Sequence, residues 1–150
     1  KVHDMREPFE EKFDAIFNLF TSFGYFEDEA DNLKTLIAIK DSLSETGFAV
    51  IDFMNVNQVI ETLVPEEVKT VDQIDFHIKR YVKEGHIYKE ISFEDQGQNY
   101  HFTEKVRAFS LQDFQELMDE AGIYLLDIFG DYKLKKFHKT DSERLIMIFK

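Results

Sequence analysis

FDAIFNLF, at residues 13 to 20, is an almost continuously apolar run built mainly from phenylalanine, isoleucine and leucine. A run of this length and composition is typical of a strand buried on both faces of a parallel sheet. A second run, FAVIDFM at residues 48 to 54, has the same character. We therefore expect two parallel strands, with the first in the centre of its sheet.

The segment between the two runs has the marks of an amphipathic helix. Carboxylates at residues 27 to 29 suit the positive end of a helix dipole, and Gly47 stands where a left-handed cap residue would end the helix. The apolar residues at helical spacing are Ala30, Leu33, Leu36, Ile37 and Leu43. Residues 13 to 54 are thus predicted to form a strand, a helix and a second strand, joined by a right-handed crossover.

The middle of the chain changes from a helical period to the alternation typical of strands. The expected antiparallel strands are Ile74–Ile78, Ile87–Ser92 and Tyr100–Phe109. Glu84-Gly85 and the residues from Asp95 to Gln98 supply turn chemistry between them. We interpret residues 56–109 as an inserted three-stranded β-meander.

The last third of the chain predicts one helix followed by two strands. Ser110 and Asp113 have the spacing of a capping box, and Gly122 is placed to end the helix. The apolar stripe of this helix consists of Leu111, Phe114, Leu117, Met118 and Ala121. The strands expected at residues 123–129 and 144–149 are joined by a connection without helical period, which favours antiparallel pairing.

Composition narrows the function classes. A chain of 150 residues that is 43% hydrophobic can build one domain with a single core, and its net charge of -12 argues against nucleic acid. The absence of cysteine excludes a disulfide framework, and the five histidines show no zinc-binding spacing. No apolar stretch is long enough to span a membrane, so we expect a cytoplasmic protein with no metal site.

Two local stretches resemble class I S-adenosylmethionine-dependent methyltransferases. His3-Asp4-Met5-Arg6, followed by residues 13–20, is similar to the family's adenine-binding loop and fourth strand, and a Thr46-Gly47 turn and the helix from Ser110 to Gly122 follow in the family's order. The resemblance implies an α/β fold with a partial Rossmann-like sheet, in which parallel strands are joined by a terminal antiparallel strand. It also makes residues 56–109 an inserted β-meander for substrate choice or dimerisation within a single domain of residues 1–150.

The chain departs from the family pattern in its cofactor motif. The family's Gly-x-Gly loop and the acidic residue that ends its second strand are absent, and none of the six glycines forms a glycine-rich turn between a strand and a helix. The chain also opens with Lys1. We therefore expect an N-terminally truncated domain that is inactive in isolation and has a bare sheet edge that promotes homo-oligomers such as a dimer.

The resemblance implies site residues without implying a catalytic one, because methyl transfer mainly requires alignment of the reactants. Cofactor contacts would come from Asp4, Met5, Asn18, Leu19 and Phe20. Substrate contacts would come from Ser22, Tyr25, Phe26, Asn55 and Arg107, with Asp52 beside them. Each has a plainer interpretation: Asp4 as a loop aspartate, Asn18 as a turn cap, Asp52 and Asn55 as solvent-facing, and Arg107 as a surface ion-pair partner.

The function that this pattern favours is transfer of a methyl group from S-adenosylmethionine to a small molecule. The alternative is a non-enzymatic Rossmann-like interaction or dimerisation module. A third option is a nicotinamide-dependent enzyme, and the absence of a glycine-rich motif from this chain argues against that option as well. The lysines at residues 133–139 are interpreted as a solvated turn, with an anion or partner contact as the other interpretation.

Overall fold

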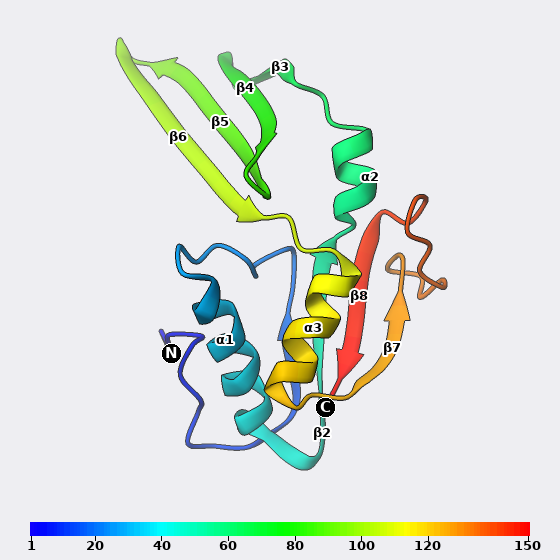
Figure 1. The fold of residues 1–150 in the computed structure, drawn as a ribbon. Helices are drawn as coiled ribbons and strands as arrows, with labels where there is room; N and C mark the ends of the chain where they lie inside the picture. Colours follow the sequence, from blue (N-terminus) through cyan, green and yellow to red (C-terminus); the bar gives the residue numbers. More distant parts are fainter. The chain divides into compact units, whose positions relative to one another are not determined.

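The computed structural model describes residues 1–150 and divides into two compact units. Unit 1 contains Lys1–Val59 and Phe109–Lys150, and unit 2 contains Ile60–Ala108 (Figure 1). No helix in the structure is long and apolar enough to cross a membrane.

Unit 1 is built on a four-stranded mixed sheet in the order β1-β2-β8-β7. The strands are β1 (Phe13–Asn18), β2 (Leu43–Met54), β7 (Leu125–Phe129) and β8 (Arg144–Phe149). β1 and β2 are parallel, whereas β8 runs antiparallel between β2 and β7. The expected α/β class is confirmed, as are the parallel pairing of β1 with β2 and the antiparallel pairing of β7 with β8.

β1 is an edge strand, so the prediction that it lies in the centre of its sheet is wrong for this chain. It pairs with β2 on one side and with no strand of this chain on the other. Its Phe17 side chain is 58% exposed and meets the ring of Phe48, which is 38% exposed, on the same face of the sheet. An apolar run therefore forms a strand here without becoming buried.

Two helices cover the other face of this sheet. They are α1 (Glu29–Ser42) and α3 (Leu111–Ala121), which contact each other, and Figure 1 shows both on the same side of the sheet. Between them and the sheet lies a cluster of aromatic rings with centroids 5.2 to 6.3 Å apart. Its members are Phe23, Phe53, Phe109 and Phe114.

The predicted ends of α3 are confirmed, whereas the predicted C-terminal end of α1 is wrong. α3 begins with the predicted capping box at Ser110 and Asp113 and ends at Gly122 with a φ of 66°. α1 ends one residue before Leu43, and Gly47 lies inside β2 and caps nothing. A Cβ on Gly47 would lie 2.8 Å from the carbonyl oxygen of Phe13, so close contact between strands explains this glycine, and the expected Thr46-Gly47 turn is wrong.

Unit 2 is a four-stranded antiparallel sheet in the order β3-β4-β5-β6. Its strands are β3 (Glu66–Val71), β4 (Ile74–Lys83), β5 (His86–Asp95) and β6 (Gln98–Arg107), and a short helix, α2 (Val56–Glu61), precedes them in the chain. The sequence predicted three of these strands and missed β3. The turn before β4 uses Asp72 and Gln73 at positive φ, so it carries no glycine signal.

Candidate functional site

Four of the polar residues predicted for the site lie near the C-terminal ends of β1 and β2, namely Asn18, Ser22, Asp52 and Asn55. Because the two strands are parallel, their carboxyl ends, at Asn18 and Met54, meet at one edge of the sheet. Arg144 opens the antiparallel β8 opposite Met54, so it reaches the same edge. Open α/β sheets bind ligands at this position.

Asp52 is the centre of a hydrogen-bond network at this edge. Its side chain is only 2% exposed, and Arg144 donates from Nε to Oδ1 at 2.7 Å. The hydroxyl of Tyr132 and the backbone N–H of Phe20 both donate to Oδ2, at 2.9 Å each. A buried carboxylate is stable only when it is paired and hydrogen-bonded, and these three donors provide that.

The same network holds Phe20 and Thr21, which form the turn after β1. Thr21 N–H donates to the Asp52 carbonyl oxygen at 3.0 Å, and Arg144 Nη2 donates to Thr21 Oγ1 at 3.0 Å. Phe20 and Thr21 have φ values of 60° and 57°, in the left-handed region that costs non-glycine residues free energy. The contacts to Asp52 and Arg144 therefore hold a strained turn.

Asn18 and Met5 share a cavity of about 140 Å³ between the N-terminal segment, β1 and α1. Asn18 is buried, and its Oδ1 accepts a hydrogen bond from Ser22 Oγ at 3.1 Å. The other residues that line the cavity are Glu7, Phe9, Ile16, Phe17, Ala38, Ile39 and Ser42. The structure thus brings together one predicted cofactor residue from each of two segments.

Asp4 precedes the cavity residue Met5 in the chain and is bound by Arg6. Arg6 donates to both carboxylate oxygens of Asp4, and its Nη1 donates to Asp31 at 2.7 Å, which ties the N-terminal segment to α1. These hydrogen bonds from Arg6 lower the pKa of Asp4 to about 2. The Arg6 guanidinium also lies 5.1 Å from the ring centroid of Phe26, a predicted substrate residue.

The remaining predicted residues have different surroundings. Leu19, Phe20 and Tyr25 are exposed, and Phe20 is 78% exposed. Asn55 is buried, and its Nδ2 donates to the carbonyl oxygens of Lys139 and Ser142 at 2.9 and 2.7 Å. Asn55 therefore fastens the connection between β7 and β8, and the interpretation of Asp52 and Asn55 as solvent-facing is wrong.

Arg107 belongs to unit 2, where its Nη1 donates to the carbonyl oxygen of Gly85 at 3.1 Å. In the same unit, Ser92 Oγ and His101 Nδ1 are 2.9 Å apart across β5 and β6. No group of three or more His, Cys, Asp or Glu side chains in the structure is arranged to hold a metal ion.

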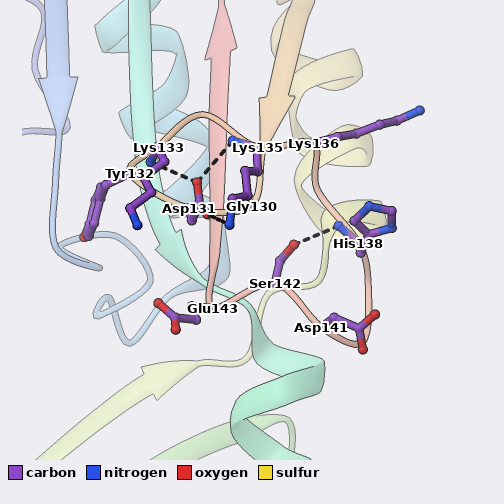
Figure 2. Close-up of a pocket in the computed structure, with 10 residues that line it drawn as sticks. All are labelled: Gly130, Asp131, Tyr132, Lys133, Lys135, Lys136, His138, Asp141, Ser142 and Glu143. Carbon is purple, nitrogen blue, oxygen red and sulfur yellow. Dashed lines mark hydrogen bonds and ion pairs between the residues drawn. The ribbon is translucent and has the colours of Figure 1, made fainter.

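The connection from Gly130 to Glu143 surrounds a second cavity, of about 510 Å³ (Figure 2). Asp131 organises it by accepting backbone hydrogen bonds from Lys133 and Lys135 at 2.8 and 3.1 Å. These hydrogen bonds, the one from Lys135 first, lower the pKa of the Asp131 carboxyl. The lysines and His138 share the lining with Asp131, Asp141 and Glu143, so the cavity has no clear preference for an anion.

Arg144, Tyr132 and Thr21 are the members of the edge network that sequence reasoning missed. A charged residue that opens the otherwise apolar run RLIMIF is the one signal that could have drawn attention to Arg144. Nothing local marks Tyr132, which lies 80 residues from its partner Asp52.

Solved structures with a similar fold include S-adenosylmethionine-dependent methyltransferases. The methyltransferase from Clostridium acetobutylicum ATCC 824 matches the whole chain with a TM-score of 0.86 at 21% identity. CcbJ from Streptomyces caelestis matches 99% with a TM-score of 0.82 at 11% identity, and CalS10 from Micromonospora echinaspora, an amino pentose methyltransferase, matches 98% with 0.68 at 13%. The chain has the class I methyltransferase fold.

These matches confirm the expected resemblance to class I S-adenosylmethionine-dependent methyltransferases at the level of the fold. The chain spans 63%, 62% and 62% of the lengths of these three structures, less than two thirds in each case. No protein-family model matches the sequence, and no curated protein matches it significantly. At identities of 21% and below, the likeness is one of fold.

Proposed function

We propose that this chain is the substrate-side part of an S-adenosylmethionine-dependent methyltransferase that acts on a small molecule. The observation that carries the proposal is the match of the whole chain to such an enzyme with a TM-score of 0.86. The sheet of unit 1 would be one half of a larger sheet in a single domain, and the four-stranded insert would contribute to substrate choice or to dimerisation. CalS10, whose substrate is an amino pentose, supports a small-molecule acceptor.

The residues present fit part of S-adenosylmethionine. Met5 and Asn18 line one cavity, with an apolar surface and one amide, and Asp4 lies next to Met5 in the chain. Met5 would pack against the adenine ring, and the Asp4 carboxylate would accept a hydrogen bond from the adenine amino group. The cavity of about 140 Å³ is well below the roughly 300–1,000 Å³ typical of ligand pockets. The rest of the cofactor would therefore be held by residues outside this chain.

The residues after β1 would orient the reactants. S-adenosylmethionine supplies an activated methyl group, so the protein has to align the acceptor with it and needs no covalent nucleophile. Asn18, Leu19 and Phe20 would face the cofactor. The substrate contacts proposed are Ser22, Tyr25, Phe26, Asn55 and Arg107, of which Asn55 is the least accessible because its amide is bound within the protein.

A non-enzymatic interaction module is the second candidate, and the unpaired edge of β1 favours it. The backbone groups along that edge are free to pair with a strand from another chain, and the neighbouring rings of Phe17 and Phe48 are partly exposed. In that function, the fold would persist as a docking element for a second copy of the chain.

Calorimetric titration of S-adenosylhomocysteine tests the two candidates. The ligand is titrated into the 150-residue chain and into a longer form that adds the family's glycine-rich strand and helix before Lys1. A matched Met5→Asp variant of the longer form places a carboxylate where the adenine ring would pack. We expect binding by the longer form alone, and at least about tenfold weaker binding by the variant, because a buried unpaired carboxylate is costly.

Each other outcome has a definite meaning. Tight binding by the 150-residue chain would show that its own residues complete the cofactor site and would overturn the half-site. Absence of binding by both forms would overturn the methyltransferase proposal and favour the interaction module. If the Met5→Asp variant bound the ligand as tightly as the unsubstituted longer form, Met5 would not be part of the cofactor site.

A further inference from the structure

The buried carboxylate of Asp52 accepts hydrogen bonds from three segments that are far apart in the sequence. Asp52 lies in the buried C-terminal part of β2, Phe20 follows β1, and Tyr132 and Arg144 come from the connection after β7 and from β8. Arg144 lies 92 residues from Asp52 and 123 residues from Thr21, which it also contacts. These contacts fix the turn after β1 with respect to two other strands of unit 1.

The turn that they hold would not adopt this conformation unaided. Phe20 and Thr21 are consecutive residues with positive φ, and neither is glycine. Such residues persist in the left-handed region only when surrounding contacts determine their conformation. Such contacts are present here: the two backbone N–H groups each donate to an oxygen of Asp52, and Arg144 donates to the Thr21 hydroxyl.

Tyr132 and Arg144 act on the turn through Asp52. The Arg144 guanidinium lies 5.9 Å from the centroid of the Tyr132 ring, so the two side chains also support each other. In Figure 2 the Tyr132 side chain points away from Lys136 and His138 of the same connection. Its hydroxyl shares Asp52 Oδ2 with Phe20 N–H, which places the phenol beside the exposed Phe20.

We propose that Asp52, Arg144 and Tyr132 are positioning residues that set the Phe20–Thr21 turn and thereby the placement of Asn18 and Phe20 at the ligand-binding edge. The role at a cofactor rests on the proposed function, whereas the control of the turn does not. None of the three residues contacts the reacting atoms in this proposal. They act through Asn18 and Phe20, which would face the cofactor.

The experiment is amide hydrogen exchange on the ¹⁵N-labelled 150-residue chain and two variants. Tyr132→Phe removes one donor to Asp52 and keeps the ring, and Arg144→Met removes the cation that compensates the carboxylate. We expect exchange at Phe20 and Thr21 to become about tenfold faster, because a hydrogen bond to a charged group is lost from the network. Lys136→Met, a cation removed from the same connection without a contact to Asp52, is the control.

The core amides of β2 and β8 separate positioning from general stability. We expect Ile51 and Met147 to keep their protection in Tyr132→Phe while Phe20 and Thr21 lose theirs. Equal loss at all four amides, or unchanged exchange at Phe20 and Thr21, would overturn the proposal. If Arg144→Met fails to fold, Tyr132→Phe decides the result alone, because the exposed ring is retained.

The role at the cofactor has a separate measurement. In the longer form that binds S-adenosylhomocysteine, Tyr132→Phe should weaken binding about tenfold. Unchanged affinity together with faster exchange at Phe20 would overturn the proposal that the network positions Asn18 and Phe20 for the cofactor. If the parent form binds no ligand, the proposed function fails, and the exchange result still decides whether the network controls the turn.

Discussion

At the scale of single residues, the Asp4 carboxylate shows how far local contacts change a titration. Hydrogen bonds from Arg6 lower its pKa to about 2, so the ionised form is favoured in the folded chain. We predict that the Asp4 carboxyl signal in an NMR pH titration has a midpoint near 2, and that Arg6→Gln raises it towards the ordinary value of about 3.9. Lys12→Gln, which removes a cation that contacts Asp41, should leave the midpoint unchanged.

The sign of this shift fixes its effect on stability. Because the folded-state pKa of Asp4 is below the unfolded value, its contribution is complete above the unfolded pKa and is lost as the pH falls towards 2. Loss of the contribution on raising the pH would contradict the Arg6 contact. The contribution is small because solvent screens an exposed ion pair.

Asn55 gives a prediction for stability. Its side-chain N–H groups satisfy two backbone carbonyls, so Asn55→Ala leaves both oxygens without that donor and opens a small cavity. We expect a loss of about 2–4 kcal/mol in the free energy of unfolding, measured by urea denaturation at one protein concentration. Asn99→Ala, at an exposed strand position, should change it by less than about 0.5 kcal/mol. Equal losses would show that Asn55 does not anchor the connection.

The sequence placed Asp52 and Asn55 near the C-terminal end of a strand but did not indicate the hydrogen-bond partners of their side chains. Asp52 lies near the end of the apolar run at residues 48–54 and Asn55 follows that run, so the pattern alone places them at a strand end. The Phe20 N–H lies 32 residues from Asp52, and four other partners of these side chains lie 80 to 92 residues away, namely Tyr132, Lys139, Ser142 and Arg144. No spacing rule applies over these separations. The exposed or buried state of a polar residue depends on those partners, which is why the solvent-facing interpretation was wrong.

At the scale of elements, the start of α3 is set by local chemistry. Ser110 Oγ accepts from the N–H of Asp113, and Ser110 N–H donates to the Asp113 carboxylate at 2.7 Å. Ser110→Ala should lower the free energy of unfolding by about 1 kcal/mol in urea denaturation, because one helix N–H loses its acceptor. Gln115→Ala, at an exposed position of the same helix, is the control. An equal effect would mean that the capping box is not the cause.

Elements that depend on local signals were predicted more accurately than those that depend on pairing. The capping box and Gly122 bound α3 correctly because both act within one turn of helix. Residues 43–47 continue a helical spacing, yet Leu43 pairs with Phe13 and begins β2, because tertiary pairing overrides propensity. β3 was missed because EEVKTV is polar and its turn has no glycine.

At the scale of the whole molecule, the faces of the unit 1 sheet differ in how well they are covered. α1 and α3 bury Ile51, Phe53 and Met147 completely on one face. On the other face, Phe17 and Phe48 stay partly exposed beside the unpaired edge of β1. An apolar, unpaired edge is a template for pairing with another strand. Such a strand could come from a longer form of the protein or from a second copy.

The 150-residue chain should therefore associate through β1 in a concentration-dependent way. We predict that multi-angle light scattering gives a mass above 17.8 kDa at high concentration and that Phe17→Glu returns it to 17.8 kDa, because a charge on the apolar edge disfavours pairing. Leu126→Glu is the matched control, since Leu126 is similarly exposed, at 53%, on β7 at the opposite edge. Dissociation by Leu126→Glu alone would place the contact at β7. A parent chain of 17.8 kDa at every concentration would show that the β1 edge does not need a partner.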